Sequence, residues 1–151
     1  MPVKHILVPT DLSEYADYAL DYAIALAQKL QARLTLLHII HLTPLAMGDI
    51  GGAGLVPYLE EMEADAQQRM QTLLNRVHQE GLQGEIAVVQ GVPFQTIIDR
   101  AGNEEVDMIV MGTHGRTGLI HALMGSVAEK VVRLSPCPVL VTREKTEASD
   151  A

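Results

Sequence analysis

The chain has 151 residues, of which 48% are hydrophobic and 20% charged, which is enough for one globular domain with a buried core. Its 19 acidic and 11 basic side chains give a net charge of −8, and aromatic residues make up only 3%, so nucleic-acid and acidic-membrane partners are disfavoured. No apolar run approaches the ~18 residues of a membrane helix, and the first residues lack a signal-peptide core, so we expect a cytoplasmic protein.

Short apolar runs alternate with amphipathic segments in chain order. Buried strands are predicted at residues 4–9, 33–40, 85–91, 106–112 and 137–142. Helices are predicted between them, at 14–31, 57–79, 92–102 and 126–134.

Local signals set the ends of the predicted helices. Asp11 with Glu14, or Ser13 alone, offers the first N-cap. Pro57 is expected to open the second helix, because the glycines of residues 41–56 argue against regular structure there.

Cys137 is the only cysteine of the chain, so an intrachain disulfide is excluded. The apolar surroundings of Cys137 in the sequence predict a buried, inert thiol.

This alternation predicts an α/β fold with one open parallel sheet and helices on both faces. We expect residues 1–143 to form one domain and residues 144–151 a flexible tail. Ligands of such folds bind beyond the carboxyl ends of the strands, where the strand order reverses.

The segment "GTHGRTGLIHALMGS", residues 112–126, follows a predicted strand and carries four glycines, one arginine and no carboxylate. Its glycines allow close approach of backbone to a ligand, and Gly125-Ser126 precedes a helix whose first amides can face an anion. Ser126 can cap that helix or donate to a phosphate. No Gly-Lys-Ser/Thr and no G-x-G-x-x-G occurs, so from the residues alone a phosphate site and a merely long turn remain equally open.

The spacing Gly112-x2-Gly115-x9-Gly125-Ser126 resembles the G-2x-G-9x-G(S/T) signature of ATP-binding universal stress proteins. The similarity extends over nearly the whole chain, through "ILVPTDLSE", "LLHII", "QGVP" and the closing "CPVLV". The resemblance implies a five-stranded sheet in the order 3-2-1-4-5, an ATP site between strands one and four, and a homodimer through the last strand, residues 138–142.

The resemblance also implies roles for individual residues, with Asp11 at the ribose and Ile39 at the adenine. The pocket is expected to hold ATP with Mg²⁺ on its phosphates. The implied nucleotide-binding residues are Pro9, Thr10, Asp11, Ile39, Met111, Gly112, Gly115, Arg116, Gly125, Ser126 and Val127.

The leading hypothesis is an ATP-binding regulator in a stress response, acting on a downstream protein that the sequence does not name. The alternatives are a slow ATPase or nucleotide hydrolase, and a nucleotide-free dimeric interaction module. We assign no catalytic residue, because no paired carboxylates accompany the glycine segment. We also assign no metal ligand, since His38 and His41 lack a third partner and are interpreted as structural.

Overall fold

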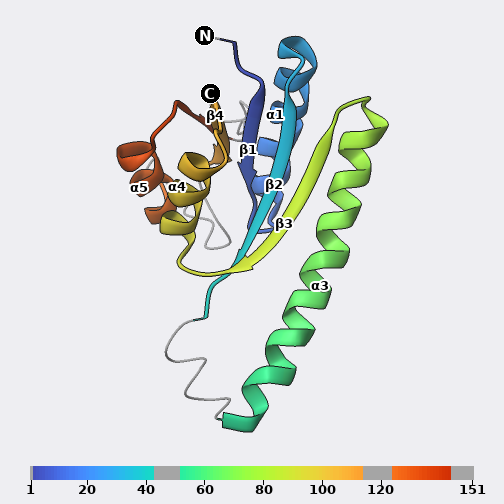
Figure 1. Cartoon of the computed structure of the whole chain (residues 1–151), viewed down its shortest axis with the longest axis vertical. Coiled ribbons are helices and arrows are strands. Elements are labelled where there is room, and N and C mark those ends of the chain that lie inside the picture. The colour runs from blue at the N-terminus through green and yellow to red at the C-terminus, as the bar shows by residue number, and fades with distance from the viewer. Residues whose placement is uncertain (1, 43–51, 114–123, 144–151) are drawn as a thin grey trace, which may run out of the picture.

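The computed structural model of the chain describes residues 2–42, 52–113 and 124–143. Strands and helices alternate throughout these residues (Figure 1). The strands are β1 His5–Pro9, β2 Arg33–Ile40, β3 Gly84–Gln90, β4 Met108–Gly112 and β5 Val139–Thr142. The helices are α1 Glu14–Leu30, α3 Gly52–Gln79, α4 Pro93–Asn103 and α5 Ser126–Leu134. The predicted alternation is therefore confirmed, and the bounds agree closely except at the start of α3.

The strands form one parallel sheet in the order β3-β2-β1-β4-β5. This order confirms the expected topology, with β1 at the centre between β2 and β4. The strand order reverses its direction between β1 and β4. The carboxyl ends of these two strands lie at the same edge of the sheet.

Helices cover both faces of the sheet, and alternate residues of the strands point to each. On one face, Ile6 and Val8 of β1 pack in a core with buried residues of α1 and α3. On the other, Leu7 of β1 packs with buried residues of α4 and α5. Burial on both sides explains the continuous apolar runs of the strands.

The first helix begins after a compact turn. Ser13 is the N-cap of α1, and its Oγ accepts a hydrogen bond from the Ala16 N–H at 3.3 Å. Asp11 is not the cap; its Oδ1 accepts a bond from the Ser13 N–H at 3.0 Å. Of the two caps that the sequence allowed, the structure selects Ser13 and leaves Asp11 at the end of β1.

The start of α3 corrects the sequence-based expectation. The helix begins at Gly52, so Pro57 lies inside it instead of opening it. Pro57 lies in the second turn, where a proline removes one N–H bond, and residues 56–58 around it are exposed to water, which limits the cost. The glycines permitted the helix where we had expected them to prevent it. The first turns of α3 project past the carboxyl edge of the sheet (Figure 1).

None of the helices in the described part of the chain has the length and apolar character needed to cross a membrane. The predicted tail, residues 144–151, lies outside the described residues.

Candidate functional site

A cavity of about 330 Å³ opens at the carboxyl ends of β1, β2 and β4. It lies at the topological switch point of the sheet, where open parallel sheets bind their ligands. Nine of the residues predicted from the sequence line it: Pro9, Thr10, Asp11, Ile39, Met111, Gly112, Gly125, Ser126 and Val127. The other two predicted residues, Gly115 and Arg116, lie outside the described residues.

Hydrogen bonds fix the end of β1 at the rim of this cavity. The Thr10 N–H donates to the Leu37 carbonyl at 2.8 Å, which extends the ladder by one residue. The Thr10 Oγ1 accepts a bond from the Leu12 N–H at 3.0 Å. Leu12 adopts a φ of 66°, and the chain turns sharply here. The Asp11 carboxylate is therefore held at a defined place at the mouth of the cavity.

A histidine supports this turn from beneath. His38 is buried, and its Nδ1 donates to the Thr10 carbonyl at 2.9 Å. This contact confirms the structural role expected for His38. The His38 ring does not line the cavity. It positions the backbone of Thr10, which does.

The other wall is formed by the end of β4 and the start of α5. The Gly125 N–H donates to the Thr113 carbonyl at 2.7 Å, and the Thr113 N–H donates to the Thr142 carbonyl at 3.0 Å. These bonds place the two ends of the glycine segment next to each other and next to β5. Thr113 and Gly125, near the two ends of the segment, therefore meet beside the cavity.

Gly125 is the N-cap of α5 and makes no side-chain cap bond. Ser126 is the first residue of the helix, so its hydroxyl does not cap it, which removes one of the two roles considered for it. Ser126, Val127 and Ala128 all line the cavity. The N–H groups of a first helical turn have no intrahelical acceptors, and the helix dipole favours negative charge there. This wall is suited to an anion.

The cavity also has an apolar wall that sequence reasoning missed in part. Leu37, Pro93 and Ile97 line it together with the predicted Ile39 and Met111. Leu37 was detectable, because it lies two residues before Ile39 on the same face of a strand. Pro93 and Ile97 belong to α4, whose placement no local signal revealed. The remaining unpredicted lining residues are Ala16, Thr113 and Ala128.

The arrangement suits a ligand with a flat apolar part and an anionic part. The apolar wall offers van der Waals contact, Asp11 and Thr10 offer polar contacts between the walls, and the start of α5 offers amides. In open parallel α/β sheets, a pocket at the switch point is the place where ligands bind. The model of the Universal stress protein family matches residues 2–143, and the chain belongs to this family.

Relatives match over almost their full length. Universal stress protein MJ0577 of Methanocaldococcus jannaschii is 36% identical over 155 aligned positions, which cover 94% of this chain and 96% of the relative. A solved structure of MJ0577 superposes with a TM-score of 0.86 at 31% identity, covering 97% of this chain and 100% of that chain. The sequence-based family assignment is thus confirmed.

Two further solved structures carry nucleotides. One is the universal stress protein from Archaeoglobus fulgidus in complex with dAMP, with a TM-score of 0.70, 23% identity, and coverage of 95% of this chain and 100% of that chain. The other is a universal stress protein in complex with cAMP, with a TM-score of 0.71, 22% identity, and coverage of 95% and 98%. At these identities the likeness to this chain is one of fold.

Proposed function

We propose that the protein binds ATP in the cavity at the switch point and acts as a nucleotide-dependent regulator in a stress response. The observation that carries the proposal is the pairing of two unlike walls in one cavity. Leu37, Ile39 and Ile97 form an apolar slot of the kind that receives a base, and the start of α5 presents amides suited to phosphates.

The bound nucleotides of two relatives support an adenine nucleotide, since dAMP and cAMP share the adenine base. Preference for a triphosphate rests on the glycine signature. Gly115 and Arg116 are proposed to complete the phosphate site, with Mg²⁺ neutralising charge on the phosphate oxygens. The cytoplasm is the compartment proposed for this activity.

Hydrolysis of the bound ATP is proposed to be slow or absent. Among the described residues that line the cavity, Asp11 is the one with an ionisable side chain. It is held by the Ser13 N–H, and no second ionisable side chain among the described lining residues pairs with it to activate water. Bound ATP then works as a switch to the extent that it binds two states of the protein differently.

Calorimetry with the nucleotide-free protein tests the binding proposal. ATP is expected to bind more tightly than AMP, and Ser126→Ala to weaken ATP by about 0.5–1.5 kcal/mol through loss of one hydrogen bond. Thr72→Ala is the matched control, because the Thr72 hydroxyl donates to the Gln68 carbonyl of its own helix at 3.3 Å and does not line the described cavity. Equal affinities for ATP and AMP, or no ATP binding at all, would contradict the proposal. A steady-state turnover above about 1 s⁻¹ would favour an ATPase instead.

We also propose a symmetric homodimer through β5. This strand lies at the edge of the sheet, and its residues Val139, Leu140 and Val141 are half-buried within one chain. An edge strand presents unpaired backbone groups that proteins normally cover. Pairing with a second copy across a two-fold axis satisfies them, and the axis makes that pairing antiparallel.

A further inference from the structure

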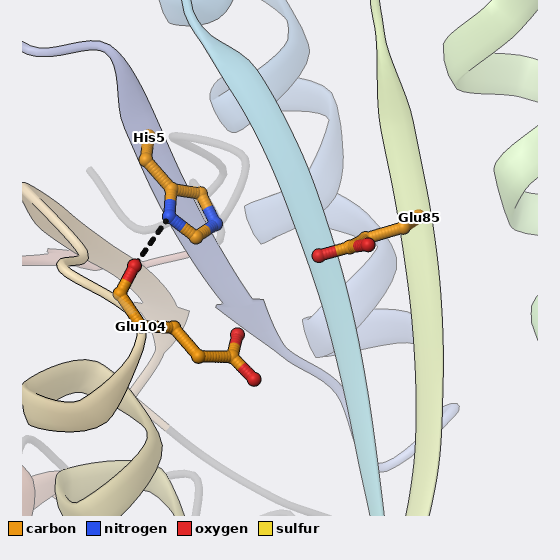
Figure 2. Close-up of side chains that lie close together, drawn as sticks. All are labelled: His5, Glu85 and Glu104. Carbon is orange, nitrogen blue, oxygen red and sulfur yellow. Dashed lines mark hydrogen bonds between the residues drawn. The ribbon is translucent and has the colours of Figure 1, made fainter.

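A group of metal-ligating side chains lies at the amino ends of the strands, at the end of the sheet opposite the nucleotide cavity. His5 is the first residue of β1, Glu85 the second residue of β3, and Glu104 directly follows α4. One ligand atom from each lies within 4.8 Å of the other two. Figure 2 shows the Glu85 carboxylate reaching across β2 toward the His5 ring, with Glu104 approaching from the other side.

We propose that His5, Glu85 and Glu104 bind a divalent transition-metal ion of the Zn²⁺ type. One imidazole nitrogen and two carboxylate oxygens form a mixed set of ligands that borderline ions such as Zn²⁺ accept. Mg²⁺ and Ca²⁺ are less suited, because they prefer oxygen ligands throughout. The site is separate from the proposed Mg²⁺ on the ATP phosphates, since it lies at the other end of the strands.

The His5 ring is already held as in metal sites. Its side chain is buried, and its Nδ1 donates to the Glu104 carbonyl at 3.3 Å. A metal-binding histidine typically donates one ring N–H to such an acceptor, which leaves the other nitrogen for the metal. Here that nitrogen is Nε2, which faces β2.

The Thr35 hydroxyl links two of the proposed ligands. Its Oγ1 lies 2.8 Å from the His5 Nε2 and donates to the Glu85 Oε1 at 3.1 Å. A Zn–N bond is about 2.0 Å long, so an ion on Nε2 displaces the Thr35 hydroxyl from that nitrogen. The hydroxyl keeps Glu85 as its acceptor, so it is not left without a partner.

The two carboxylates are able to close around an ion. Glu85 is exposed and meets Arg33 at a long 3.7 Å, and exposed ion pairs of this kind are weak. Glu104 meets the Arg100 Nε through one oxygen, Oε1, at 2.8 Å. Neighbouring ligand atoms around tetrahedral Zn²⁺ are about 3.3 Å apart, so the exposed Glu85 and the half-buried Glu104 must rotate to bring the set together.

Titration of the full-length, untagged and nucleotide-free protein with Zn²⁺ tests the proposal. Calorimetry measures the affinity, and spectra that correlate ring protons with imidazole nitrogens identify the ring that binds. We expect the His5 Nε2 signal to shift on addition of Zn²⁺. Glu85→Gln and Glu104→Gln should each weaken binding about tenfold or more. Glu129→Gln is the matched control, because it removes a carboxylate paired with Arg133 on α5 and should leave the affinity unchanged.

Glu85 and Glu104 are accessible, so both variants are expected to fold, and their unfolding temperatures verify it. Zn²⁺ binding that is the same in wild type, Glu85→Gln and Glu104→Gln would overturn the proposal, since the ion would then lie elsewhere. Absence of Zn²⁺ binding would overturn it too.

Discussion

Cys137 is a half-buried thiol whose chemistry is set by burial and by two neighbours. Burial raises its pKa, a hydrogen bond with Ser135 opposes the rise, and the Asp107 carboxylate adds to it. A thiol that ionises less readily in the folded state stabilises the fold below its unfolded pKa, about 8.5. That contribution is lost as the pH rises toward the folded value.

We therefore predict a pH-dependent difference between wild type and Cys137→Ser. Urea denaturation should show that wild type loses more stability than the variant between pH 8 and the more alkaline range, because the unfolded thiol releases its proton first. Alkylation of the folded thiol should be slow, and slower still in Ser135→Ala. Alkylation at the rate of a free thiol would contradict the assignment.

Gly84 is a point of close packing between α3 and the sheet. A Cβ at this position lies 3.0 Å from the Val77 Cγ1 and 3.1 Å from the Leu74 Cδ1, and both side chains are buried. We predict that Gly84→Ala lowers the free energy of unfolding by about 1–3 kcal/mol, as overpacking does. Adding Val77→Ala should recover part of that loss, which a double-mutant cycle measures.

Gly102 provides the control for this substitution. It is an exposed residue of α4, and a Cβ there has no atom within 4 Å. Gly102→Ala should raise stability by a few tenths to about 1 kcal/mol through helix propensity and reduced unfolded-state entropy. Equal effects at the two glycines would mean that packing of α3 on β3 is looser than the structure indicates.

At the scale of an element, the hydrogen bonds between β4 and β5 decide which backbone groups of β5 remain available to a partner strand. The Ile109 N–H donates to the Pro138 carbonyl and the Thr113 N–H to the Thr142 carbonyl. Because main-chain groups alternate along a parallel strand, those of residues 138, 140 and 142 face β4. Those of Val139 and Val141 face the open edge.

Val141→Pro is predicted to turn the dimer into a folded monomer. The change removes an N–H from the open edge and leaves the bonds to β4 in place, and proline is tolerated at strand edges. Light scattering over a range of concentrations measures the mass, and Val141→Thr, which keeps the amide, should remain dimeric. A wild type that is monomeric at high micromolar concentration would show that β5 is covered in some other way.

At the scale of the whole molecule, the proposed nucleotide site joins both halves of the sheet. Its lining residues come from β1, β2, β4, α1, α4, α5 and the adjoining loops, so the proposed ATP site is complete only when these elements are assembled. At a hundred times its Kd, ATP should stabilise the fold by about 2.7 kcal/mol. Denaturant midpoints measure this, and Ser126→Ala should show a smaller rise at the same ATP concentration.

The proposed Zn²⁺ site provides a second test at this scale. It lies at the opposite end of the strands and shares no residue with the nucleotide cavity. If the two sites are independent, the stabilisation by ATP and Zn²⁺ together equals the sum of the two measured singly, within about 0.5 kcal/mol. A larger departure would mean that the ends of the sheet are energetically coupled.

The sequence by itself determined the strands and helices and part of the site. Strand β2 and helix α5 have the predicted bounds, because apolar runs, helical periodicity and the Gly125-Ser126 start are local features. The glycine signature and the strand ends placed nine predicted residues around the cavity, helped by the resemblance to a family. Such residues follow one another along the chain, so their spacing carries the information.

Only the tertiary structure decided which distant residues meet. Pro93 and Ile97 reach the cavity because α4 packs against the sheet beside β1 and β2, and His38 supports Thr10 because β1 and β2 pair in one register. His5 and Glu104 are 99 positions apart in the chain. Their contact depends on strand order, register and the packing of α4, and these are set by the burial of apolar surface on both faces of the sheet, a property of the whole fold that no local spacing records.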